Sequence, residues 1–147
     1  IFNFKFEDPS NKNINFKRIR IRNLINDLKT EGLSLEKLRL TINNLSYSNL
    51  TINHYVNENI RNNSKYNRLK KNYILNDNFF NQPYEIVFRS FSDSLKTIGE
   101  KYFFARGKKI DNILKKITEN KFSKETLGGC IIKKVKRTVI ISKEYQI

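Results

Sequence analysis

Three arginines at alternate positions follow a short acidic turn, and together they could bind a phosphate group. The turn is Glu-Asp-Pro-Ser-Asn at residues 7–11, and the arginines are Arg18, Arg20 and Arg22. Proline fixes φ, and Asp, Ser and Asn side chains bond nearby backbone N–H groups, which gives such a turn a defined shape. Guanidinium groups match phosphate oxygens with two parallel hydrogen bonds. We therefore predict a nucleotide or nucleic-acid phosphate site at these arginines, with Asp8 and Asn11 holding the turn.

A solvated basic face is the alternative for the same arginines, with Asp8 as an ion-pair partner at a helix start. Alternate residues share one face of a strand. On a helix they lie about 200° apart, so only some of the three could reach one ligand. The adjacent carboxylates of Glu7 and Asp8 could suggest acid–base catalysis, but neighbouring carboxylates usually only solvate a turn.

Two further basic clusters lie in the second half of the chain. One comprises Lys133, Lys134, Lys136 and Arg137 between two apolar runs, and the other comprises Arg106, Lys108 and Lys109 at a predicted helix start. Cations at a helix start oppose the helix dipole, so their presence favours an anionic partner. We predict that both clusters contact RNA backbone, the alternative being charged loops that keep a hairpin soluble.

The composition restricts the classes of function. Lys and Arg number 29 against 14 Asp and Glu, which gives a net charge of +15 and implies a polyanionic partner. Nucleic acid is the first expectation and an acidic membrane surface the second. With one cysteine, Cys130, and one histidine, His54, an internal disulfide is impossible and a structural zinc site is excluded. No apolar run approaches the length of a membrane span, and we expect a cytoplasmic protein.

Hydrophobic periodicity predicts an α+β fold that is mainly helical. We expect a strand over residues 1–6, helices over 14–29, 34–62, 84–98 and 106–118, and a β-hairpin with a cationic tip around 131–141. The predicted organisation is a first domain of residues 1–63, a linker of 64–82 and a small α+β module of 83–147. Tyr66 to Leu75, inside the linker, is predicted to be a short strand or irregular.

Several apolar and aromatic side chains have a structural interpretation. A stripe at helical spacing is expected to form a packed core face: Leu35, Leu38, Ile42, Leu45, Ile52 and Val56. Phe79 and Phe80 are also expected in a core, although aromatic residues among Lys and Asn could stack unpaired bases. Gly128, Gly129 and Cys130 are expected to form a tight turn with a buried thiol.

Two groups of motifs resemble one enzyme family, the tRNA(Ile)-lysidine synthases. The first is the Asp-Pro-Ser-Asn turn leading into the arginine-rich helix start. The second is the order helix, Gly99, Tyr102, Ala105-Arg106, helix, Leu127-Gly128-Gly129-Cys130 and β-hairpin. This order is similar to the distal region of family members with a short C-terminus. Residues from about 43 to 81 carry no recognisable motif.

The resemblance implies an ATP-dependent ligase that modifies tRNA. In this family, ATP with Mg²⁺ adenylates the C2 carbonyl oxygen of the wobble cytidine of tRNA(Ile) with a CAU anticodon, and the ε-amine of free lysine then attacks C2 and displaces AMP. The family's Ser-Gly-Gly-x-Asp-Ser loop for ATP does not occur in these 147 residues. We therefore expect the C-terminal part of a longer enzyme, with Asp8, Asn11 and Arg20 at the active-site rim and no catalysis by this part alone.

Two other functions remain open. The first is a stand-alone basic RNA- or ribosome-binding module without catalysis. The second is a membrane-surface or structural protein with a cationic face. Binding to tRNA but not to anionic vesicles would distinguish these two.

Overall fold

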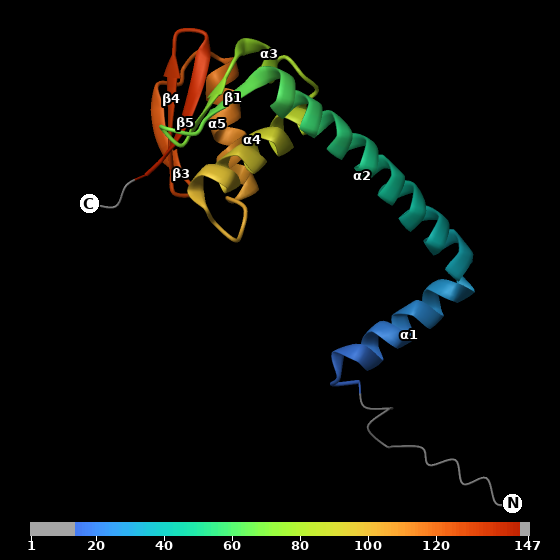
Figure 1. Cartoon of the computed structure of the whole chain (residues 1–147). Coiled ribbons are helices and arrows are strands. Elements are labelled where there is room, and N and C mark those ends of the chain that lie inside the picture. The colour runs from blue at the N-terminus through green and yellow to red at the C-terminus, as the bar shows by residue number, and fades with distance from the viewer. Residues whose placement is uncertain (1–13, 145–147) are drawn as a thin grey trace, which may run out of the picture. The chain divides into compact units, whose positions relative to one another are not determined.

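The computed structural model describes residues 14–144, which form a mainly helical α+β fold (Figure 1). The predicted strand over residues 1–6 and the side chains of Asp8 and Asn11 lie outside these residues. The chain divides into two compact units, and the boundary falls between Tyr47 and Ser48. This boundary lies within a helix.

The first unit contains helix α1 (Lys17–Thr30) and the first part of helix α2 (Leu35–Asn63). The two helices begin and end within a few residues of the predicted positions. Ser34 caps α2, because its Oγ accepts a hydrogen bond of 3.1 Å from the backbone N–H of Lys37. Gly32, with φ of +92°, ends the preceding turn.

The predicted core stripe of α2 is confirmed only in its last turns. Val56 is 3% exposed, but Leu35, Ile42 and Leu45 are each more than 60% exposed. The prediction of a packed face was therefore wrong for the N-terminal part of the helix. The spacing of apolar residues correctly indicated an apolar face on α2, but such a face is buried only where another element packs against it.

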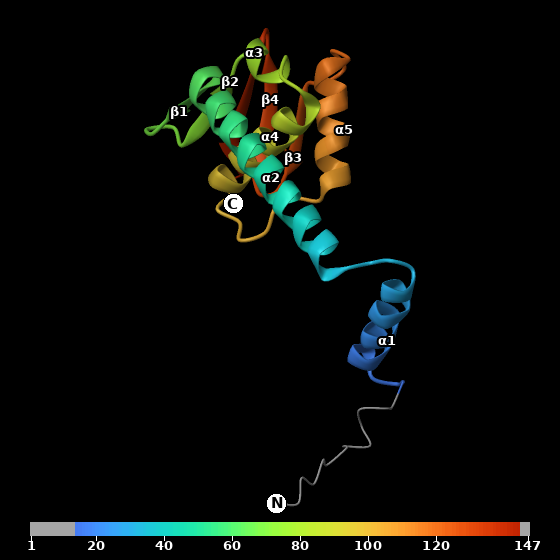
Figure 2. The same cartoon turned by 90° about the vertical axis from the view of Figure 1, so that its right-hand side faces the viewer.

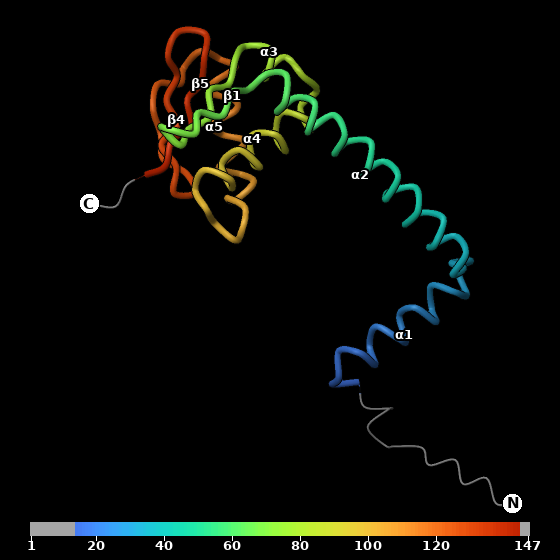
Figure 3. The backbone as a smooth tube through the Cα atoms, viewed as in Figure 1, coloured from blue at the N-terminus to red at the C-terminus, as the bar shows by residue number. Residues whose placement is uncertain are grey.

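The second unit contains a five-stranded antiparallel sheet in the order β1-β2-β5-β4-β3. The strands are β1 (Ser64–Asn67), β2 (Asn72–Leu75), β3 (Lys124–Leu127), β4 (Cys130–Val135) and β5 (Thr138–Lys143). The predicted hairpin is present as β4 and β5, and its tight turn can be followed along the chain path in Figure 3. Strand β3, which no prediction included, pairs with β4 at the edge of the sheet.

The interval 64–82, for which we predicted a linker, belongs to this sheet. It holds β1, β2 and the short helix α3 (Asp77–Phe80). The strand β2 pairs with β5 in antiparallel register, so residues far apart in sequence meet at the centre of the sheet. The short strand that we had considered for residues 66–75 is present as β2, but Ser64, Lys65, Asn67 and Asn72 have low strand propensity and did not indicate a paired β1 and β2.

Helices α4 (Tyr84–Gly99) and α5 (Gly107–Thr118) pack on one face of the sheet, as Figures 1 and 2 show. The core between them includes Phe91 and Ile110 from the helices and Ile132 and Ile141 from the strands, all fully buried. Alternate strand residues point to the opposite face, where no helix of the second unit lies in either view. Within the second unit, this sheet face is therefore open.

Candidate nucleic-acid interface

The three arginines near the N-terminus lie on α1 and do not share one face. Arg18 and Arg22 are four residues apart and lie on one side of the helix, whereas Arg20 lies on the opposite side. The Arg20 Nη1 donates hydrogen bonds of 3.1 and 3.0 Å to the carbonyl oxygens of Ile14 and Asn15. The exposed pair of Arg18 and Arg22 is thus better placed for one phosphate than Arg20.

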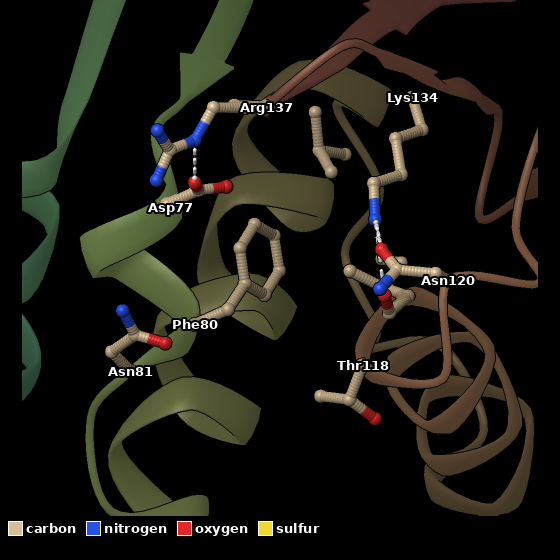
Figure 4. A pocket seen from close by; sticks show the side chains of 9 residues that line it. Asp77, Phe80, Asn81, Thr118, Asn120, Lys134 and Arg137 are labelled. Carbon is tan, nitrogen blue, oxygen red and sulfur yellow. Dashed lines mark hydrogen bonds and ion pairs between the residues drawn. The ribbon is translucent and has the colours of Figure 1, made fainter.

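The four cations of the β4–β5 hairpin separate into two pairs. Lys134 Nζ donates hydrogen bonds to the Ile117 carbonyl oxygen (3.2 Å) and to Asn120 Oδ1 (2.7 Å), at the C-terminal end of α5. A cation at this end of a helix is favourable. Arg137 forms an ion pair of 2.6 Å with Asp77. Figure 4 shows both side chains at the rim of a pocket of about 340 Å³ between α3, α5 and the hairpin.

The other two cations of the hairpin, Lys133 and Lys136, are exposed to solvent. Lys136 lies in the two-residue turn with φ of +54°. Lys133 lies on the open face of the sheet, directly opposite Lys124 of β3. Like charges at directly opposed positions repel each other, so an anion between them would stabilise the pair.

The alternation of each strand assigns three lysines to the face of the sheet that α4 and α5 do not cover: Lys65 on β1, Lys124 on β3 and Lys133 on β4. Partly buried isoleucines lie between them, namely Ile74, Ile131 and Ile140. We call this surface the open sheet face. None of the strand residues assigned to it is acidic, and the exposed Glu144 follows directly after β5. The three lysines give the strands of this face a positive charge that suits a polyanion.

The third predicted cluster lies at the start of α5. Arg106 occupies the N-cap position, and Lys108 and Lys109 follow in the first turn. All three side chains are exposed, and no acidic residue lies in the first turn. The structure therefore brings these cations together, as the sequence analysis predicted.

A loop that precedes this helix adds residues that the sequence analysis did not select as a site. Tyr102, Phe103 and Phe104 are consecutive and exposed, and the ammonium group of Lys96 lies 4.3 Å from the centroid of the Phe104 ring. The signal available in the sequence was three adjacent aromatic residues followed by Arg106, Lys108 and Lys109. Only Tyr102 had been noted, as part of a motif.

Residues of the second sequence motif meet at one place in the fold. Gly99 ends α4 and packs directly on the carbonyl group of Gly128. The Cys130 thiol, which is fully buried, donates a hydrogen bond of 3.2 Å to the Leu95 carbonyl oxygen. Burial raises the pKa of this thiol to about 11, so it stays protonated and unreactive near neutral pH. The predicted tight turn with a buried cysteine is thus present, and its role is packing.

Metal chemistry finds no support in the part of the chain that the structure describes. No group of three or more His, Cys, Asp or Glu side chains there could hold a metal ion. None of the helices within residues 14–144 has the length and apolar character needed to cross a bilayer.

Comparisons with protein families, curated proteins and solved structures find no match to this chain. Its function therefore has to be inferred from its residues and their geometry.

Proposed function

We propose that this chain is the C-terminal, tRNA-docking part of a tRNA(Ile)-lysidine synthase. The complete enzyme would use ATP and Mg²⁺ to join free lysine to C2 of the wobble cytidine in tRNA(Ile) with a CAU anticodon, in the cytoplasm. The open sheet face, the turn at Lys136 and the start of α5 would hold the sugar–phosphate backbone. Contacts of this kind position an RNA without reading its sequence.

The observation that carries the proposal is that the strand positions of the open sheet face hold three lysines and no acidic residue. Lysines on three of its strands lie around an apolar centre, and the like-charged pair of Lys124 and Lys133 faces solvent on neighbouring strands. A protein has no folding advantage in placing like charges opposite each other. A phosphate backbone supplies the missing counter-charge and releases bound cations on association.

The residues of the second motif, on which the family resemblance partly depends, form one packing unit in the fold. Gly99 and Gly128 are in direct contact, and Gly128 faces Ala105 across the loop between α4 and α5. Residues that are separated along the chain but form one contact would be kept together in a family. The motif is therefore explained as one packing unit rather than as several independent short matches.

The exposed apolar residues of the first unit also fit the proposal. Large apolar side chains of α1 and the first half of α2 are exposed, among them Leu24, Leu28, Leu35, Ile42 and Leu45. So many large exposed apolar side chains on two helices indicate an interface with another protein part. The catalytic domain of the parent enzyme would cover it, with Asp8, Asn11 and Arg20 close to the active site.

ATP does not fit the residues of this chain itself. The phosphate-binding loops of nucleotide enzymes rely on clustered glycines whose N–H groups surround the phosphates. Here Gly99, Gly128 and Gly129 are engaged in the contact between α4 and β4, and Gly32 and Gly107 stand alone. We therefore assign no step of adenylation or lysine transfer to this chain, which should bind tRNA and catalyse nothing.

The test is binding of the chain to tRNA(Ile) with a CAU anticodon and to an elongator tRNA of similar size, each at two salt concentrations. Salt-dependent binding that favours tRNA(Ile) would support the proposal. Equal affinity for both would fit the stand-alone basic RNA- or ribosome-binding module, or a docking part whose discrimination between tRNAs resides in the rest of the enzyme. Absence of binding, or ATP hydrolysis by the isolated chain, would contradict the proposal.

A further inference from the structure

The loop between α4 and α5 exposes an unusual amount of aromatic surface. Tyr102 is 85% exposed, Phe103 78% and Phe104 54%. Phenylalanine is among the residue types that are most often fully buried. Three consecutive exposed aromatic rings therefore indicate a binding surface. The rings of Tyr102 and Phe103 contact each other edge to face, with centroids 4.9 Å apart. We call residues 100–106 the aromatic loop.

Both ends of the aromatic loop are fixed to the β3–β4 turn. Before the loop, Gly99 packs on the Gly128 carbonyl group, and at its other end Ala105 lies against Gly128. Glu100 adopts the left-handed conformation and its carboxylate accepts a hydrogen bond from Lys143 of β5. Because the ends are held by the sheet, the rings in between are presented to solvent without the entropy cost of ordering a free loop on binding.

Cations surround these rings, and the rings line a hollow. An open cavity of about 610 Å³ is lined by the three aromatic side chains together with Lys96, Glu100 and Lys101. Glu100 is the one acidic residue lining it, and its charge is compensated by Lys143, which also lowers the pKa of the carboxyl group. Lys96 and Lys101 make no ion pair within the described residues, and Arg106 follows at the start of α5.

We infer that the aromatic loop binds an unpaired nucleotide of the tRNA, with the base stacked on Tyr102 or Phe103 and the phosphate held by Lys96 or Lys101. The inference rests on the proposed function, which supplies the RNA partner. Aromatic rings beside lysines form the usual platform for single-stranded nucleic acid, because every base has a face that can stack. Base-paired RNA cannot use such a platform.

A lipid surface is the competing partner for exposed aromatic residues next to lysines. Membrane-binding segments place their rings on a continuous apolar face that enters the lipid interface. Here the three rings share a wide-open depression with Lys96, Glu100 and Lys101, so charged residues interrupt the apolar surface. This combination of rings and lysines favours a planar ligand that carries a negative charge, as a nucleotide does.

Two sets of variants of the complete chain test this inference. The first is the double variant Tyr102→Ser with Phe103→Ser, compared with the control Tyr55→Ser, which removes an exposed aromatic side chain from α2. We expect the double variant to lose affinity for tRNA(Ile) on the order of tenfold, with an unchanged salt dependence because no charge is removed. The control should bind like the parent chain.

The second variant is Phe103→Trp, which gives the chain its only tryptophan. Single-stranded oligouridylate should quench its fluorescence by stacking, whereas a blunt RNA duplex should not. Because the readout is local, it reports on the loop even if other surfaces dominate the affinity.

The outcomes separate the inference from the proposed function. If the parent chain binds tRNA and the double variant binds equally well, the aromatic loop is not a stacking site but the proposed function stands. If the parent chain does not bind tRNA, both fail. If the double variant instead loses binding only to vesicles of phosphatidylglycerol, the loop binds lipid and the inference is overturned.

Discussion

Gly99 and Gly128 approach so closely that a Cβ atom on Gly99 would lie 2.2 Å from the Gly128 carbonyl oxygen. The same Cβ would lie 3.2 Å from the Cys130 sulfur. This contact joins the end of α4 to the β3–β4 turn and fixes the first end of the aromatic loop. Glycine is required at residue 99 because no side chain fits, not because of an unusual backbone conformation.

We predict that Gly99→Ala destabilises the protein by about 1–3 kcal/mol, because the backbone of the β3–β4 turn has to move to accept a methyl group. Urea unfolding followed by circular dichroism measures the change. Gly107→Ala is the matched control, since its Cβ would lie 3.7 Å from Phe88, an ordinary contact. Gly107 lies in the first turn of α5, where alanine should be neutral or slightly stabilising. Equal stability of the two variants would contradict the contact.

A second prediction concerns Asn59, which is 3% exposed in α2. Its Nδ2 donates hydrogen bonds of 3.2 Å to the Phe79 carbonyl oxygen and to Ser90 Oγ, which connects α2 to α3 and α4. Asn59→Ala leaves both acceptors buried without their donor, which should cost about 2 kcal/mol of the free energy of unfolding. The control Asn57→Ala, on the exposed side of the same helix, should change it by less than about 0.5 kcal/mol.

The sequence was sufficient to predict the helices and the β4–β5 hairpin, but not the five-stranded sheet. Amphipathic periodicity and the Ser34 cap located α1, α2, α4 and α5 closely, because these signals are local. The strands β1 and β2 consist of four residues each and pair with each other, but only β2 joins them to the rest of the sheet, through β5, some sixty residues later in the chain. Strand pairing at such a distance depends on tertiary contacts, which local patterns do not record.

The candidate site was predictable at the level of clusters but not of individual cations. Lys134 and Arg137 are adjacent in sequence to Lys133 and Lys136, yet they bond to α5 and α3 within the protein. The alternation of strand β4 separates Lys133 from Lys134, but the face that each would occupy became known only with the sheet. By contrast, the separation of Arg20 from Arg18 and Arg22 followed from the helix predicted over these residues, which α1 confirms.

A third prediction follows from the buried thiol of Cys130. Its pKa is raised to about 11 in the folded protein, chiefly by burial, whereas an unfolded thiol titrates near pH 8.5. The folded state therefore keeps a proton that the unfolded state loses. The resulting stability is fully present below about pH 8.5 and is lost as the pH rises toward 11.

Comparison with Cys130→Ala isolates this effect from the tyrosines that also titrate at high pH. We expect the difference in unfolding free energy between the parent chain and the variant to shrink between about pH 8.5 and 11, by at most about 1.4 kcal/mol per pH unit. Urea unfolding at a series of pH values measures it. A difference that stays constant over this range would show that folding does not raise the pKa of the Cys130 thiol.

The last prediction distinguishes the solvent-exposed Lys133 and Lys136 from Lys134, which forms hydrogen bonds within the protein. Lys133→Gln and Lys136→Gln should each weaken binding to tRNA and reduce the slope of log affinity against log salt by roughly one, since each would remove one phosphate contact. Both side chains are exposed and make no hydrogen bond among the described residues, so stability should hardly change.

Lys134→Met should reduce stability rather than the salt dependence of tRNA binding. Its ammonium group bonds the Ile117 carbonyl oxygen and Asn120 at the end of α5, so its loss should lower the free energy of unfolding by about 1 kcal/mol. The salt dependence of tRNA binding should stay that of the parent chain, because this charge is directed to the protein itself. A reduced salt slope in Lys134→Met with unchanged stability would place the RNA on the helical side of the hairpin instead of on the open sheet face.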